Sequence, residues 1–260
     1  NRLLVMDASG DTIDLPGTET IEPTFGLPAM WVDPDNREEA TFKGYTVVDP
    51  ATVITTHLTE LIRDNMSELL SYAETQNLLD ELPNEHQKLV GEVVPNQISV
   101  GGIQRVLQNL LNERVSIRDL PTILEGISEA CAFTRNVTQI TEHVRSRLAR
   151  QISEQNSTED NFIPLVTLSA EWEQIFSDSI LDQGEDKQLS MAPSQLQRFI
   201  GAVRTTLDEL ADTEDPPVVL TSPSARPFVR SIIERFRPTT SIMSQNELHP
   251  KAKIKTLGQI

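Results

Sequence analysis

Side chains able to do chemistry are sparse in this sequence, and their spacing does not fit a reaction centre. The four histidines are scattered, with no pair at a metal-ligand spacing: His57, His86, His143 and His249. Acidic pairs such as Asp208–Glu209 are adjacent on a predicted helix, where neighbouring residues do not face each other. No glycine-rich phosphate loop, nucleophile elbow, HExxH helix or calcium loop occurs. We therefore expect no enzymatic activity and no metal or other cofactor.

The single cysteine also fits a chain without a reaction centre or a metal site. Cys131 lies between Ala130 and Ala132 late in a predicted helix, as a small buried apolar residue would. One cysteine excludes an intrachain disulfide and a multi-cysteine zinc site, and this usage is typical of a reducing cytosol.

Composition limits the classes of partner. The chain has 260 residues and a net charge of −17, which argues against nucleic acid and against unassisted docking on an anionic membrane. Partners with basic or apolar surfaces remain open. No apolar run approaches the roughly 18 residues of a membrane helix. The chain begins without methionine, and we expect it to be a fragment of a longer protein.

Residues 44–66 predict a strand followed directly by a helix, and we expect these two elements to position any functional site. Tyr45 to Val48 predicts a short strand, and Asp49 followed by Pro50 predicts the capped start of a helix. We expect one helix face to be buried, comprising Val53, Ile54, His57, Leu58, Leu61, Ile62 and Met66. The other face carries Thr52, Thr55, Thr56, Thr59 and Glu60. These threonines are either a tolerated loss of helix propensity or a small uncharged surface for docking.

The preceding residues, 1–44, predict short strands and turns. Pro23, Gly26 and Pro28 prevent a helix and interrupt a central strand, and Val32 is expected to begin a new strand. Phe25 and Leu27 then stand out from an irregular segment. They form either a satellite core under a loop or a presented apolar patch.

The rest of the chain predicts helices and then an alternating α/β unit. Asp119 is expected to cap the helix 120–132, and Thr138 the helix 139–152. Residues 151–161 predict a polar linker. In the α/β unit we expect strands at 162–168, 218–221, 240–248 and 251–257. We expect helices at 169–181, at 193–210 and within 222–236. An acidic loop is expected at 182–187 and a break in the helical structure at 212–217. Within the helical run 67–151, Arg145, Arg147 and Arg150 form the one basic cluster, favouring a solvated face or subunit contact over DNA binding.

Two stretches carry a resemblance to a known family: GYTVVDPATVITTHLTEL at 44–61 and VLQNLLNERVSIRDLPTILE at 106–125. With Pro-x-Phe-Gly-Leu at 23–27, they resemble the cytoplasmic C-terminal domain of the flagellar export-gate family, FlhA. The resemblance implies a mixed α+β chain of several subdomains. They are a small β-rich inserted subdomain (1–49), a helix returning to a partial first α/β subdomain (50–69), a helical subdomain (70–151), a linker (152–161) and a C-terminal α/β subdomain (162–260).

The resemblance also implies a site. The family's dimple for export chaperones and their substrates falls on Glu22, Phe25 and Thr56, with Leu27, Val48 and Val53 nearby, and the family commonly has Asp where this chain has Glu22. It further implies a nine-fold ring, contact with the stalk of the export ATPase, and a membrane-spanning half at the bacterial inner membrane with this domain on the cytoplasmic side. The export gate of a virulence secretion system remains an alternative, as does a helical nucleic-acid-binding module.

Overall fold

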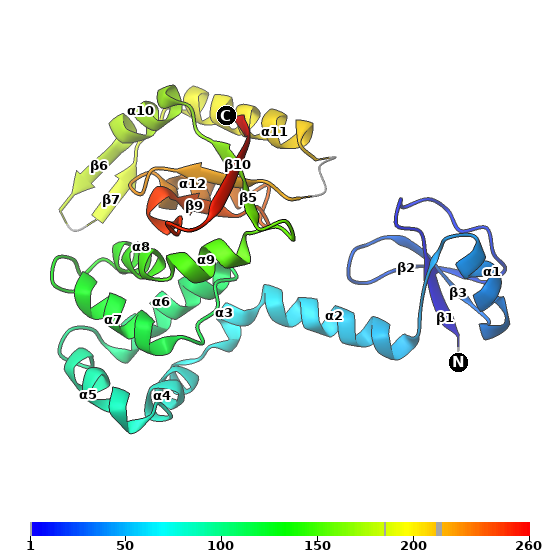
Figure 1. Ribbon diagram of the computed structural model, residues 1–260, viewed down its shortest axis with the longest axis horizontal. Helices are drawn as coiled ribbons and strands as arrows, with labels where there is room; N and C mark the ends of the chain where they lie inside the picture. The colour runs from blue at the N-terminus through cyan, green and yellow to red at the C-terminus, as the bar shows by residue number, and fades with distance from the viewer. Residues whose placement is uncertain (1, 185, 212–214) are drawn as a thin grey trace. The chain divides into compact units, whose positions relative to one another are not determined.

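The protein is described by a computed structural model that covers residues 2–184, 186–211 and 215–260 (Figure 1). Helices and strands are mixed along the chain, which confirms the predicted α+β class. The chain divides into two compact units, Asn1–Leu69 and Leu70–Ile260.

The first unit is built on an antiparallel sheet with the strand order β2-β3-β1-β4. The strands are β1 (Leu3–Met6), β2 (Thr18–Ile21), β3 (Pro28–Val32) and β4 (Thr46–Val48), and the helices are η1 (Pro34–Asn36), α1 (Arg37–Phe42), α2 (Pro50–Asp64) and α3 (Met66–Leu69). Successive strand residues face opposite sides, so Val5 packs with Ala40 of α1 while Leu4 packs with Val53 of α2. The sheet therefore has a small core on each face.

The expectation that Val32 begins a strand was wrong. Strand β3 starts at Pro28 and ends at Val32, and β2 is a strand that the sequence did not predict. Pro28 is tolerated in the sheet because it is the first residue of its strand.

The predicted strand and helix around Asp49 are confirmed. The Asp49 side chain accepts the backbone N–H of Thr52 at 3.0 Å, and Pro50 is the first helical residue. The predicted burial of α2 was wrong, because only Val53 is buried and Ile54 and Leu58 keep 66% and 54% of their surface exposed. Leu61 and Ile62 are exposed as well. The helix turns its Val53 side toward the sheet, and in the described chain its apolar stripe faces outward.

The second unit begins with helices α4 (Tyr72–Asp80), α5 (Asn84–Val93), α6 (Val100–Asn112), α7 (Leu120–Ala130), α8 (Val137–Arg147) and α9 (Ala149–Gln155). Asp119 caps α7 as predicted. Thr138 does not cap α8: the side chain of Asn136 accepts the N–H of Gln139 at 3.0 Å. The predicted single helix breaks at Leu148, and α9 then continues through Gln155 into the segment expected to be a linker.

A parallel sheet with the order β10-β5-β8-β9 follows. Its strands are β5 (Phe162–Thr167), β8 (Val218–Thr221), β9 (Ile242–Ser244) and β10 (Lys253–Gln259), joined by α10 (Ala170–Ser179), α11 (Pro193–Glu209), α12 (Arg226–Ile233) and η2 (Gln245–Glu247). The expected acidic loop at 182–187 belongs instead to a hairpin of β6 (Ile180–Gln183) and β7 (Asp186–Leu189). Residue 185 of that loop and residues 212–214 of the predicted break lie outside the described residues.

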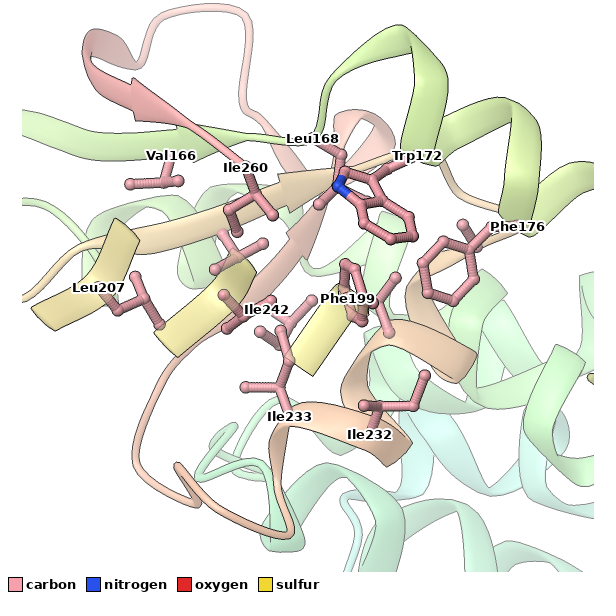
Figure 2. Close-up of a cluster of buried hydrophobic side chains, with 14 residues drawn as sticks. Val166, Leu168, Trp172, Phe176, Phe199, Leu207, Ile232, Ile233, Ile242 and Ile260 are labelled. Atoms are coloured by element: carbon pink, nitrogen blue, oxygen red, sulfur yellow. The ribbon is translucent and has the colours of Figure 1, made fainter. Parts of the chain in front are cut away.

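The core of this α/β part lies between the sheet and its helices. Figure 2 shows Trp172 and Phe176 of α10 beside Phe199 of α11. Both rings meet Phe199 edge to face, with centroids 5.1 and 4.9 Å apart. Aromatic pairs of this geometry add to the stability gained from burial alone. Three of the chain's twelve Phe, Trp and Tyr residues thus meet where α10 packs against α11.

A buried cluster of charges joins the helices of the second unit to its α/β part. Arg226 of α12 is 1% exposed and forms hydrogen bonds with Glu113, at the end of α6, and with Glu142 of α8. Arg145 of α8 pairs with Glu247, which is also 1% exposed. Each buried charge therefore has a partner from a distant part of the sequence.

Candidate partner-binding surface

The residues expected to form the site begin in the loop between β2 and β3, which is closed by its own hydrogen bonds. The Glu22 side chain is 3% exposed, and its Oε2 accepts the backbone N–H groups of Thr24 at 3.0 Å and Phe25 at 2.6 Å. The Glu22 N–H donates to the Leu27 carbonyl at 2.8 Å, and the Gly26 N–H donates to the Glu22 carbonyl at 3.0 Å. Gly26 has a φ of 69°, a conformation that a residue without Cβ adopts readily.

The electrostatics of Glu22 agree with this geometry. Burial raises the pKa of the Glu22 carboxyl. The hydrogen bonds from the N–H groups of Phe25 and Thr24, together with the nearby His57 side chain, lower this pKa by more than burial raises it, so it lies below its ordinary value. The ionised carboxylate is therefore the form that closes the loop. Ala29, in the strand that follows this loop, packs with Val53 of α2.

Phe25 is held at its backbone and exposed at its ring. Its side chain keeps 67% of its surface accessible, while Leu27 is half-buried. Ile21, at the end of β2, is 68% exposed beside this loop and was missed by the sequence analysis. The sequence held a weak signal, because Ile21 directly precedes Glu22 and Pro23, where the chain leaves the strand. The loop thus presents apolar surface on a fixed backbone.

The helix side of the site combines packing residues and one polar group. Val53 is buried against Leu4 and Ala29, and Val48 is half-buried against the same cluster, so these two side chains seat α2 on the sheet. Thr56 lies three residues beyond Val53, on the same side of the helix, and is half-buried.

The threonine hydroxyls of α2 differ in availability. Thr52 donates to the Asp49 side chain, and Thr55 and Thr59 donate to carbonyls one turn earlier in their own helix. In the part of the chain that the structure describes, the Thr56 hydroxyl has no hydrogen-bond partner of this kind. Of the four, Thr56 is therefore the one free to bond to another molecule.

Comparison with known proteins identifies the family. The model of the FHIPEP family matches residues 1–253. The chain belongs to the FHIPEP family. It is 56% identical over 258 residues to the flagellar biosynthesis protein FlhA of Caulobacter vibrioides, a match that covers 99% of this chain and 37% of that protein. This FHIPEP chain thus spans just over a third of the length of that relative.

Solved structures share the fold of this FHIPEP chain. The Chlamydia pneumoniae CdsV protein is similar with a TM-score of 0.84 and 27% identity, over 99% of this chain and 75% of that one. CdsV in complex with CdsO has a TM-score of 0.79 and 28% identity, over 89% and 68%. The nonameric EscV cytosolic domain of a type III secretion system has a TM-score of 0.72 and 26% identity, over 90% and 69%.

Among the described residues, no group of three or more His, Cys, Asp or Glu side chains is placed to hold a metal ion. Cys131 is buried as predicted, and burial raises the pKa of its thiol. None of the helices in the described ranges is both long and apolar enough to span a bilayer.

Proposed function

We propose that this chain is a docking platform of a flagellar type III protein export gate, which binds export chaperones with their substrates and has no enzymatic activity. The observation that supports this proposal most directly is the closed loop 22–27, which holds the backbone of Phe25 and leaves its ring exposed. The proposed surface comprises Glu22, Phe25, Leu27, Val48, Val53 and Thr56. Within it, Phe25 and Leu27 supply apolar contact, Thr56 supplies a hydrogen bond, and Glu22, Val48 and Val53 hold these groups in place.

The physical basis is a preformed apolar anchor. Fully burying a side chain such as Phe25 contributes about 1.5–3 kcal/mol. Because the backbone of Phe25 is already fixed by Glu22, little conformational freedom is lost when a partner binds. The ligand we propose is a short amphipathic chaperone helix, which lays its apolar face on this surface and bonds to Thr56.

Two solved relatives support proposals about self-association and a further partner of the full-length protein. Because the EscV cytosolic domain is nonameric, we propose that the parent protein forms a ring, as a gate at the cytoplasmic side of the bacterial inner membrane would. The complex of CdsV with CdsO supports a second contact, which we propose to be with the stalk of the export ATPase. The net charge of −17 favours partners with basic or apolar surfaces over nucleic acid.

The test is a titration of flagellar chaperone–substrate complexes against the chain and two variants. Phe25→Ala is expected to weaken binding about tenfold or more, as the loss of an apolar anchor should. Phe42→Ala is the matched control, since Phe42 is 93% exposed in the same unit but lies in α1, outside the proposed surface. Equal losses in both variants, or a lower melting temperature for Phe25→Ala alone, would contradict the proposal.

A parallel titration with injectisome chaperones distinguishes the two branches of export gates. The 56% identity to a flagellar FlhA, against 27% to CdsV, favours the flagellar branch. Tighter binding of injectisome chaperones would assign the chain to the other branch.

A further inference from the structure

Strand β10 leaves one edge of the parallel sheet in the second unit open. It is the outer strand in the order β10-β5-β8-β9 and pairs with β5 alone (Figure 1). The residues from Lys253 to Thr256 are all exposed, and Ile254 keeps 54% of its surface accessible. Within the described ranges, no second strand bonds to the outer edge of β10. Its outward N–H and C=O groups can therefore accept another strand.

Positive charge gathers along this edge. Lys253 and Lys255 are two residues apart in the strand, so their side chains point to the same face. Lys251 and Lys253, together with Arg150 and His249, line a hollow of about 390 Å³ at the start of the strand. The chain as a whole has 22 basic and 39 acidic residues, which makes this concentration of lysine a local exception.

Among the described residues, no carboxylate forms an ion pair with these lysines. Glu154, the carboxylate that lines the same hollow, is paired with Arg150 at 2.9 Å. Lys255 lies over the ring of Phe162, with its Nζ 5.1 Å from the ring centroid. As far as the structure describes the chain, neither Lys251 nor Lys253 forms an ion pair with a carboxylate. The charges at the edge are thus available to an outside partner.

We propose that the β10 edge binds an extended acidic segment, which joins the sheet as a further strand. Main-chain hydrogen bonds to the open edge would hold the segment, and its side chains would set the specificity. Carboxylates at alternate positions would face Lys253 and Lys255, and an apolar residue between them would cover Ile254. Lysine on an edge strand works against pairing in general, and an acidic strand is the one whose carboxylates would offset this charge, so an acidic segment is the occupant that the lysines favour.

This inference concerns the second unit and does not depend on the chaperone surface of the first. The probe is a fluorescein-labelled short peptide of alternating glutamate and valine, titrated with the 260-residue chain and followed by fluorescence anisotropy. We expect saturable binding, and slower amide hydrogen exchange across 253–259 in the bound state. The variant Lys253→Glu/Lys255→Glu should bind about tenfold more weakly.

The control variant Lys88→Glu/Lys187→Glu has the same change in net charge at two lysines away from this edge, and should bind within about twofold of the parent chain. An equal loss in the control would show that only net charge matters, and would overturn the proposal. So would equal binding of a peptide alternating glutamate and proline, which cannot form a ladder. Absence of binding, or equal competition by a single-stranded oligonucleotide of the same charge, would overturn it as well.

Discussion

Arg226 and Glu113 form a two-pronged ion pair inside the second unit. Nη1 donates to Oε2 at 2.8 Å and Nη2 donates to Oε1 at 2.7 Å, while the arginine side chain is 1% exposed. The same guanidinium also donates to both oxygens of Glu142, at 2.7 and 2.8 Å, and to the carbonyl of Ile242. One side chain from α12 thus holds the end of α6, the middle of α8 and strand β9 together.

Glu113→Gln is expected to destabilise the second unit strongly. The substitution removes one of the three carboxylates that balance Arg226 and Arg145, and the loss of one partner from a buried pair costs about 3–5 kcal/mol. Urea unfolding at neutral pH measures the change in unfolding free energy. Glu125→Gln is the matched control, because Glu125 pairs with Arg147 at 3.3 Å with both side chains partly exposed, and such pairs contribute about 0–1 kcal/mol. Similar effects of the two substitutions would contradict the role assigned to Arg226.

The stability contributed by Glu113 should depend on pH in a defined window. Burial would raise the pKa of this carboxyl, but Arg226 and Arg145 lower it from its ordinary value of 4.5 to about 2. A carboxyl whose pKa falls on folding stabilises the fold fully above its unfolded pKa, and this stabilisation is lost as the pH falls toward the folded value. The difference in unfolding free energy between the parent chain and Glu113→Gln should therefore shrink between pH 4.5 and 2. A difference that does not change with pH would contradict this account.

Glu142 should behave in the opposite way although it contacts the same arginine. Burial raises the pKa of Glu142 above its ordinary value in spite of the charge of Arg226, so folding disfavours its ionised form. At neutral pH the charge of Glu142 carries a cost, which protonation removes as the pH falls through the raised pKa. Glu142→Gln should therefore destabilise the protein less than Glu113→Gln in the same urea titration. Equal or larger destabilisation would show that Glu142 is as well neutralised as Glu113.

Local signals explain which elements the sequence could predict. Asp49 and Pro50 specify the start of α2 whatever surrounds it, and Asp119 does the same for α7. Which side chains of α2 are buried could not be predicted from the spacing of its apolar residues, because this spacing identifies an apolar stripe but not the element that covers it. The β6–β7 hairpin was missed because its second strand, starting at Asp186, is polar and exposed. Such strands lack the alternation that identifies a half-buried sheet.

The candidate site was predictable in part. The resemblance singled out Phe25 and Thr56, and the structure leaves the Phe25 ring exposed and the Thr56 hydroxyl free of a partner in the described chain. The inward turn of Glu22 could not be foreseen, because it depends on backbone N–H groups that converge only when the loop closes. Whether the six residues bind a partner stays a prediction.

The sequence predicted Thr138 as the N-cap of α8, whereas in the structure the N-cap is Asn136. Asn136→Ala should cost about 1 kcal/mol, because it leaves the N–H of Gln139 without its acceptor. It also removes a hydrogen bond from the Asn136 side chain to Asp186 at 2.6 Å. Thr138→Ala should be nearly neutral, although Thr138 was the cap expected from the sequence. Thermal unfolding of both variants checks the assignment, and a larger loss for Thr138→Ala would restore the original expectation.

Glu22 should control partner binding without touching the partner. Glu22→Ala removes the acceptor that fixes the N–H groups of Thr24 and Phe25, so amide hydrogen exchange at these two residues should accelerate. The affinity for a chaperone should fall as well, although the Phe25 side chain itself is not changed. Glu19→Ala, which changes an exposed acidic residue of β2, is the control and should leave both quantities unchanged. Because the pKa of Glu22 is lowered, the loop is held above pH 4.5 and should loosen as the pH falls below that value. Weaker binding with unchanged exchange would instead mean that Glu22 contacts the chaperone directly, and the closed loop would no longer explain how Phe25 is presented.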